Sequence, residues 1–289
     1  MDESKMRADQ QDTTYILNTE SAAETARLDT QAVEVNHVTG LFPKGLRGII
    51  PLDASVLDVG CGPGTWALDV AYQYPEMEVV GIDISKTHIE YASARARSQG
   101  RQNISFEMID AFDTGYAEMS FDVVHLRFAA GWVPGASWPA LFSHLHHILD
   151  RGGWLISTEG EWPYTTASAL NQLNKLLSQA MHNAGMGLST DGYTQGVVAR
   201  MGNMLSKVGL TGTKVECSAV DFSGYRPREF KIWLDNVVAL WQLVRPFVFK
   251  HVPRSEEMID FLYDEMLRQM WEPDFCGVSS FYTYYAQKP

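Results

Sequence analysis

The stretch VLDVGCGPGT, residues 56–65, decides the fold of this 289-residue chain. It begins as an apolar run typical of a buried strand, and its closely spaced glycines allow a tight turn that brings the backbone near a ligand. A helix is expected to follow at once, with its N-terminus facing the same point. In an open α/β sheet, ligands bind in this kind of crevice at the carboxyl end of a strand.

Short apolar runs alternate with amphipathic stretches on both sides of this turn. Strands are predicted over 55–59, 78–83, 103–109, 121–127, 154–157, 213–222 and 275–286. Helices are predicted over 65–74, 85–99, 138–149, 165–184, 196–208, 228–250 and 255–271. Apolar strands alternating with helices imply a parallel sheet covered on both faces. We therefore expect an α/β protein with a Rossmann-like, mostly parallel seven-stranded sheet, helices on both faces and a helical cap.

The composition limits the classes of partner. The net charge is −12 and no cluster of Lys and Arg occurs, so the electrostatic footprint of nucleic-acid binding is missing. Acidity also argues against adsorption on an anionic membrane, and the apolar stretch 237–252 is interrupted by Gln242, Arg245 and Lys250. Three widely spaced cysteines and no signal pattern fit a reducing cytosol. We expect a cytoplasmic protein with no nucleic-acid and no membrane partner.

The glycine spacing separates two kinds of nucleotide-binding turn. The dinucleotide fingerprint is G-x-G-x-x-G, but here the third glycine comes one residue earlier and Asp58 precedes the turn. This stretch resembles motif I of the class I methyltransferases that depend on S-adenosyl-L-methionine (SAM), and the resemblance covers about residues 50–160. It implies a SAM-dependent methyltransferase, with S-adenosyl-L-homocysteine as the product of the cofactor. It also implies that Gly60, Gly62 and Gly64 lie against that cofactor.

Acidic residues end the next two predicted strands. Asp83, followed by Ile84, ends the second strand, where a carboxylate can accept hydrogen bonds from both ribose hydroxyls. The resemblance implies that Asp110 accepts a hydrogen bond from the adenine amine while Ala111 and Phe112 pack against the ring. An aspartate at a strand end can instead be only the N-cap of a helix, and that alternative stays open.

Two further residues are assigned to the cofactor through the same resemblance. Asp58 is expected near the methionine end of SAM, through its amino group or a water molecule. Arg127 ends the fourth predicted strand, and family members line the methionine and acceptor side with this segment. The alternative for Arg127 is a salt bridge at the end of a strand.

The N-terminal segment carries a second, narrower resemblance. The stretch YILNTESAAETARL, residues 15–28, is similar to the Tyr-x-Leu … Glu-x-x-Arg-Leu cap of a subgroup of small-molecule methyltransferases, many of them from secondary metabolism. The resemblance implies that Tyr15 and the following helix close over the SAM site. The alternative is an ordinary amphipathic helix packed through Leu28, Ala32 and Val35. Such N-terminal helices can exchange between protomers, so a homodimer is a further hypothesis.

These observations divide the chain into six consecutive segments. They are an N-terminal cap (1–45), a SAM-binding Rossmann-like core (46–160), a helical cap segment (161–193), a continuation of the core (194–223), an inserted helical lid (224–273) and a final core strand (274–289).

The acceptor site is expected at the carboxyl ends of the strands and under the cap. The sulfonium of SAM already activates the methyl group, so the protein has to align the acceptor, exclude water and, for some acceptors, take a proton. Glu161 is the candidate general base, and the alternative is that it caps the following helix or stays solvated. Trp132, Trp162, Tyr164 and Trp241 are the candidates for lining the acceptor site.

The second half of the chain is rich in large apolar side chains, which favours a small, hydrophobic organic acceptor. Aromatic residues at helical spacing also commonly form core, and the methylated atom, C, N or O, stays open. No metal is expected, because only His144 and His147 of the HLHHIL stretch share a helix face and no carboxylate is suitably spaced.

Other enzyme and binding classes use the same core. An aminopropyltransferase needs acids that hold a polyamine, and the fourth strand ends in HLRFAAGW, which has none. A SAM-binding module that regulates a partner, or supports a reaction other than methylation, stays as the alternative, because only turnover separates it from a methyltransferase.

Overall fold

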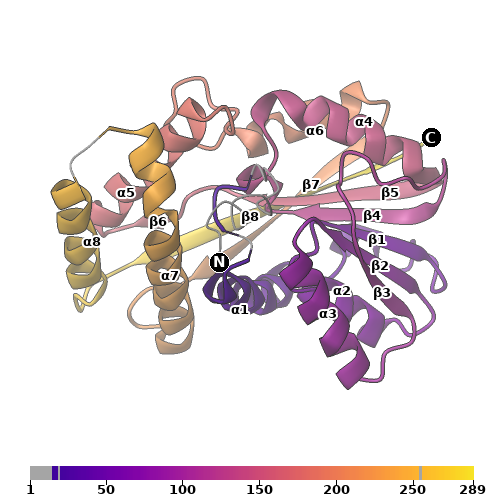
Figure 1. The fold of residues 1–289 in the computed structure, drawn as a ribbon, viewed down its shortest axis with the longest axis horizontal. Helices are drawn as coiled ribbons and strands as arrows, with labels where there is room; N and C mark the ends of the chain where they lie inside the picture. Colours follow the sequence, from indigo (N-terminus) through magenta and orange to yellow (C-terminus); the bar gives the residue numbers. More distant parts are fainter. Residues whose placement is uncertain (1–14, 19, 254–255) are drawn as a thin grey trace, which may run out of the picture.

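The computed structural model describes residues 15–18, 20–253 and 256–289 (Figure 1). The strands are β1 (Ser55–Val59), β2 (Glu78–Asp83), β3 (Ile104–Met108), β4 (Phe121–Arg127), β5 (Leu149–Gly160), β6 (Tyr164–Thr165), β7 (Thr211–Asp221) and β8 (Gly277–Gln287). The α-helices are α1 (Ala22–Thr39), α2 (Thr65–Gln73), α3 (Lys86–Ser98), α4 (Trp138–Ile148), α5 (Ser168–Asn183), α6 (Val197–Lys207), α7 (Pro227–His251) and α8 (Glu256–Met270). Three short 3₁₀ turns, η1 (Lys44–Leu46), η2 (Ala129–Gly131) and η3 (Gly135–Ser137), complete the described elements.

The strands form one mixed sheet in the order β3-β2-β1-β4-β5-β8, with β6 and β7 both paired to β8. Strands β1 to β5 run parallel to one another, whereas β8 is antiparallel to β5, β6 and β7. The parallel half places the carboxyl ends of β1 to β4 at one edge, where the open sheet leaves its ligand crevice. This arrangement confirms the predicted α/β, Rossmann-like fold with a helical cap.

The described sheet has eight strands, one more than the seven predicted. The extra strand is the two-residue β6, whose Tyr164 lies opposite Val278 of β8. Val278 pairs with Asp221 of β7 on its other side. Strand β6 therefore pairs with the same edge of β8 as β5 does, a few residues beyond the end of β5. The predicted strand 154–157 was too short, because β5 extends to Gly160 by pairing with β8.

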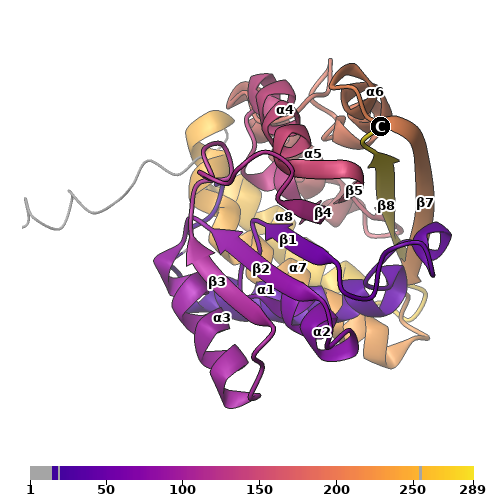
Figure 2. The ribbon, with the colours of Figure 1, turned by 90° about the vertical axis from the view of Figure 1, so that its right-hand side faces the viewer.

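Helices cover both faces of the sheet. Helices α4 and α6 pack on one face through residues such as Phe142 and Met201, while Trp66 of α2 packs on the other. Figure 2 shows α1, α2 and α3 on one side of the strands and α4 and α6 on the other. Local sequence fixes where these helices begin: the hydroxyl of Ser85 accepts a hydrogen bond from the backbone N–H of His88 at the start of α3.

Besides the two packed faces of the sheet, a further hydrophobic cluster joins α5, α7 and α8, which gather at one end of the molecule in Figure 1. By length and composition alone α7 could cross a membrane, with a mean hydropathy of 1.2 over 18 residues, but core helices of globular proteins pass the same test. Its buried residues include Trp233, Trp241 and Val248, which pack within this cluster. Helices α7 and α8 therefore pack with α5 in a cluster of their own beside the sheet.

Candidate cofactor and acceptor site

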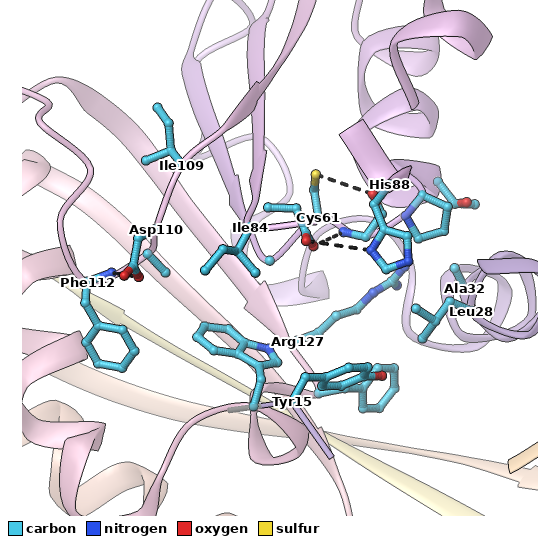
Figure 3. Close-up of a pocket in the computed structure, with 18 of the residues that line it drawn as sticks. Tyr15, Leu28, Ala32, Cys61, Ile84, His88, Ile109, Asp110, Phe112 and Arg127 are labelled. Carbon is cyan, nitrogen blue, oxygen red and sulfur yellow. Dashed lines mark hydrogen bonds and ion pairs between the residues drawn. The ribbon is translucent and has the colours of Figure 1, made fainter. Parts of the chain in front are cut away.

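A cavity of about 350 Å³ lies at the carboxyl ends of β1 to β4, with α1 along one side (Figure 3). We call it the cofactor cavity. The predicted cofactor residues that line it are Tyr15, Gly60, Gly62, Asp83, Ile84, Asp110, Ala111, Phe112 and Arg127. Residues far apart in the sequence therefore meet at the point that the glycine-rich turn indicated.

The turn after β1 and the end of β2 are held together by Asp83. One of its carboxylate oxygens accepts the backbone N–H of Gly62 at 2.9 Å, and the other accepts that of Ser85 at 2.8 Å. Gly60 has a positive φ of 65°, and a Cβ there would lie 3.1 Å from the ring of Trp132. Backbone and carboxylate can thus approach a ligand closely where any larger side chain at position 60 would crowd the cavity.

The far end of the cofactor cavity suits a flat ring. The Asp110 carboxylate is exposed, and one of its oxygens accepts the backbone N–H of Phe112 at 2.9 Å. The Phe112 ring meets that of Trp132 edge to face, with 6.5 Å between centroids. The turn uses this one oxygen of Asp110, so the other can accept from a ligand beside apolar surface on which a purine could pack.

His88 is a cofactor-cavity residue that the sequence did not single out. It is 2% exposed, and neither ring nitrogen has a hydrogen-bond partner among the described residues, although Nδ1 lies 3.6 Å from the Asp83 carboxylate. An unpaired buried polar group in a cavity wall is accounted for by a polar ligand. The glycine cradle, two strand-end carboxylates and this imidazole together fit a nucleoside.

Two predicted cofactor residues lie behind the cavity and do not line it. Asp58 is 3% exposed, and its carboxylate pairs with Nδ1 of His125 at 2.8 Å. The His125 ring in turn stacks on Trp66 with centroids 3.6 Å apart, and burial lowers the pKa of this histidine. Asp58 therefore orients a buried imidazole in this structure, rather than facing the cavity.

Gly64 is the second of these residues, and its role is packing. A Cβ on this residue would lie 2.7 Å from the Phe106 ring and 2.8 Å from Cβ of Ala92. The third glycine of the turn thus lets α2 start close beneath β3 and α3, and it lies outside the cavity lining.

Arg127 links the core to the N-terminal helix. Its Nη1 donates to Asn36 Oδ1 of α1 at 2.6 Å, and the amide of Asn36 donates to Asp69 of α2 at 2.6 Å. Burial lowers the pKa of Arg127 to about 10. The side chain therefore both lines the cofactor cavity and fixes α1 over the sheet.

The predicted cap motif forms one buried chain of hydrogen bonds. The Tyr15 hydroxyl donates to Glu24 at 2.7 Å, and Glu24, fully buried, pairs with Arg27 at 2.7 Å. Arg27 donates onward to Asn236 of α7 at 2.9 Å. Burial and the neighbouring Glu24 raise the pKa of Tyr15 well above its usual range. The Tyr, Glu and Arg of the motif thus tie the N-terminal segment to the lid.

A second cavity of about 170 Å³ adjoins the first, and we call it the acceptor cavity. Four residues, Tyr15, Leu28, Gln31 and Phe128, line both. Most of the rest of its wall comes from α1, α5, α7, η2, β8, the end of β5 and the segment after β5. The two cavities therefore meet where the cap crosses the end of β4.

Three of the predicted acceptor-site residues, Glu161, Trp162 and Trp241, line the acceptor cavity. The carboxylate of Glu161 accepts the backbone N–H groups of Gln195 at 3.1 Å and Gly196 at 3.2 Å. Burial raises the pKa of Glu161. These bonds hold the residues in front of α6 and not the start of α5, the helix that directly follows Glu161, so the carboxylate anchors the beginning of a more distant helix.

The two other candidates lie elsewhere. Trp132 lines the cofactor cavity and not the acceptor cavity, because η2 turns its ring back over Gly60. Tyr164 lines neither cavity and is 76% exposed. Its strand, β6, lies on the edge of the sheet, and the side chain at that position points outward. The assignment of both residues to the acceptor site is corrected accordingly.

Glu159 is an acidic residue of the acceptor cavity that the sequence pattern did not single out. It is 1% exposed, lines the cavity and accepts the backbone N–H of Ala129 at 2.7 Å, with that of Ala130 at 3.5 Å. Burial raises its pKa to about 8. The sequence pattern ended the strand at residue 157 and so placed residue 159 in a loop. In the structure β5 continues to Gly160, and Glu159 is paired with Tyr282 of β8 inside the sheet.

Comparison with known proteins agrees with this geometry. Residues 56–153 match a family model described as a methyltransferase domain. The methyltransferase cpsF of Aspergillus campestris is 30% identical over 158 residues, which are 53% of this chain and 55% of that protein. The secondary metabolism regulator laeA of Aspergillus fumigatus is 35% identical over 109 residues, which are 38% of this chain and 27% of laeA.

A solved structure has the same fold. It is the Haemonchus contortus phosphoethanolamine N-methyltransferase 2 in complex with phosphomonomethylethanolamine and S-adenosylhomocysteine, with a TM-score of 0.51 and 19% identity over 90% of this chain and 57% of that one. Residues 56–153 therefore carry a methyltransferase domain, and the curated relatives include a methyltransferase, cpsF, and the secondary metabolism regulator laeA. The chain spans about a quarter of the length of laeA and about half that of cpsF.

Proposed function

We propose that this protein binds SAM in the cofactor cavity and catalyses transfer of its methyl group to a small, hydrophobic organic acceptor in the acceptor cavity. The observation that carries the proposal is the shared wall: Tyr15, Leu28, Gln31 and Phe128 line both cavities. Methyl transfer is a displacement in line, so donor and acceptor have to meet across such a boundary. Bound SAM would supply a methyl group already activated by its sulfonium.

Named residues of the cofactor cavity have distinct tasks in this proposal. Asp83 accepts hydrogen bonds from the ribose hydroxyls, and Asp110 accepts one from the adenine amine while Phe112 packs on the ring. Tyr15 lines both cavities, and Arg127 directly precedes Phe128, which also lines both; we assign this side to the methionine portion. The Tyr15, Glu24 and Arg27 chain keeps the cap closed and excludes water.

The hydrophobic nature of the acceptor is supported by the cavity wall. Its apolar side chains come from helices and from β8 and include Leu177, Met181, Val237, Leu240 and Phe281. Such a surface favours an apolar metabolite over a sugar or a polar peptide. The methylated atom stays open between C, N and O.

No metal has a part in the proposal. Within the described ranges, no group of three or more His, Cys, Asp or Glu side chains is placed to hold an ion. His144, one of the three histidines in HLHHIL, lies 2.9 Å from the Thr114 hydroxyl. Action in the cytoplasm and a homodimer are further proposals, which rest on the widely spaced cysteines and on the N-terminal helix.

A regulatory SAM-binding module is the second candidate. Relatives that match more than a third of this chain carry the name secondary metabolism regulator, which favours a function exerted on other proteins. Both candidates require the cofactor cavity, so binding of SAM alone does not separate them. Turnover of an acceptor does.

The experiment combines purified protein, a host metabolite extract and SAM with a trideuterated methyl group. Mass spectrometry should show a small molecule that gains the labelled methyl group with the wild type and not with Asp83→Ala. Asp53→Ala, at an exposed position before β1, is the matched control and should retain full labelling. A labelled protein in place of a small molecule, or SAM binding without any label transfer, would contradict the proposed acceptor and favour the regulatory module.

A further inference from the structure

The wall of the acceptor cavity contains buried N–H donors without partners. They are the side-chain amide of Asn174 and the indole Nε1 of Trp233 and of Trp241, and none is hydrogen-bonded to any residue that the structure describes. These residues are 5%, 8% and 0% exposed, so water at the protein surface cannot serve as their hydrogen-bond partner. Trp162, in the same wall, shows the usual outcome, because its indole N–H donates to Ser178.

This grouping calls for a ligand. Native proteins pair nearly all of their buried polar groups, and each exception needs an explanation. Here Asn174 comes from α5 and the two tryptophans from α7, yet all three border one cavity. Packing of a single helix cannot account for donors from two helices, whereas a bound molecule that offers oxygen atoms can pair with all of them.

The charges around the cavity indicate a neutral oxygen. Glu161 lines the cavity, and a carboxylate or phosphate on the ligand would meet the repulsion of this carboxylate. Arg27, the basic residue in the lining, is already paired with Glu24 at 2.7 Å. Amide and indole N–H groups are neutral donors, which suit the oxygen of a ketone, ester or amide.

The aromatic wall indicates a flat molecule. Trp233 lies nearly parallel to Phe222, at 23° and 5.3 Å, and to Phe281, at 30° and 6.0 Å. Trp233 and Phe281 both line the cavity, so this stack gives the cavity an aromatic wall against which a planar group can pack. We propose that the acceptor is a largely apolar, planar molecule bearing one or more neutral carbonyl oxygens, which are recognised by N–H donors among Asn174, Trp233 and Trp241. That this ligand accepts a methyl group rests on the proposed function, whereas its recognition by the N–H donors does not.

The test uses two probes of nearly equal shape, 2-acetylnaphthalene and 2-isopropenylnaphthalene, which differ by a C=O in place of a C=CH₂. Their affinities for the full chain are measured by calorimetry in the presence of S-adenosylhomocysteine. The wild type should bind the ketone about tenfold more tightly, the value of one net hydrogen bond to a buried donor. A ketone oxygen accepts at most two hydrogen bonds, so at least one of Trp241→Phe, Trp233→Phe and Asn174→Leu should reduce this preference and leave the affinity for the alkene nearly unchanged.

Trp271→Phe is the control, since this tryptophan is 65% exposed and lies outside the cavity. Equal affinities for the two probes, binding of neither, or tighter binding of 2-naphthoate would overturn the inference. A ketone preference retained in all three variants would do the same. Failure of S-adenosylhomocysteine to bind, with the ketone preference intact, would overturn the proposed function and leave this recognition standing.

Discussion

The two adjoining cavities are built in opposite ways. In the cofactor cavity, strand-end carboxylates such as Asp83 and Asp110 already accept backbone hydrogen bonds from the turns beside them. In the acceptor cavity the walls come from helices and a strand spread over the chain, and donors such as Trp241 Nε1 have no partner among the described residues. The cofactor cavity is fixed by local turns and the acceptor cavity by the packing of distant segments. The shape of the first can therefore stay the same while the shape of the second changes with its ligand.

The largest effect is expected from Asp83→Ala, which tests whether the cofactor cavity holds a ribose. Loss of two charge-assisted hydrogen bonds should weaken SAM binding about a thousandfold, or by about 4 kcal/mol. Calorimetric titration with SAM measures the change. Asp53→Ala should bind like the wild type, and a loss below tenfold for Asp83→Ala would show that the carboxylate serves only the turn at Gly62.

Glu159 provides the next largest effect, on the acceptor side. Its pKa is about 8 in the folded protein against the usual 4.5, because burial disfavours the charged form. The folded state therefore binds this proton more tightly than the unfolded chain, and the free energy of unfolding should fall as pH rises from about 5 to 8, by about 3 kcal/mol from this group.

Glu159→Gln should remove that part of the pH dependence, since the amide cannot titrate and its oxygen still accepts the N–H of Ala129. Chemical denaturation at several pH values gives the curves. Glu76→Gln, at an exposed turn, is the control and should follow the wild type. Parallel curves for Glu159→Gln and the wild type would mean that the carboxyl is ionised in the folded protein at neutral pH, and that the acceptor cavity is more polar than its lining indicates.

The same contrast explains what the sequence could predict. Strand ends and glycines lie in one continuous stretch, so the local pattern of residues 56–65, with the acid at Asp83, is enough to locate the cofactor cavity. Asn174 and Glu159 reach the acceptor cavity only through the packing of α5 on the lid and through the full length of β5. Helix packing and the full length of a strand cannot be seen in a short stretch of sequence. The sequence therefore pointed to Glu161 and Tyr164, because both follow directly after the predicted strand.

Gly64 sharpens the comparison at a smaller scale, because its role is packing and not contact with the ligand. Gly64→Ala would press a methyl group against Phe106 and Ala92 at a φ of +78°, and should lower the free energy of unfolding by about 3 kcal/mol. Gly100→Ala has a similar φ of +64° but open space around it, so about 1 kcal/mol is expected. Thermal or urea unfolding measures both. Equal losses would mean that backbone strain, and not the close approach of α2 to β3, decides the cost.

The smallest effect is expected at Glu161, whose oxygens are both used by the backbone of Gln195 and Gly196. Glu161→Gln keeps one of these acceptors, so the rate of methyl transfer to the acceptor identified by labelling should change less than about threefold, with the same pH profile. Steady-state rates between about pH 6 and 9 are the measurement. If the rate instead fell about a hundredfold and the acidic limb of the profile disappeared, Glu161 would act as a general base. The acceptor cavity would then resemble the cofactor cavity in holding a strand-end carboxylate that meets its ligand directly, and the contrast between the two would be confined to their walls.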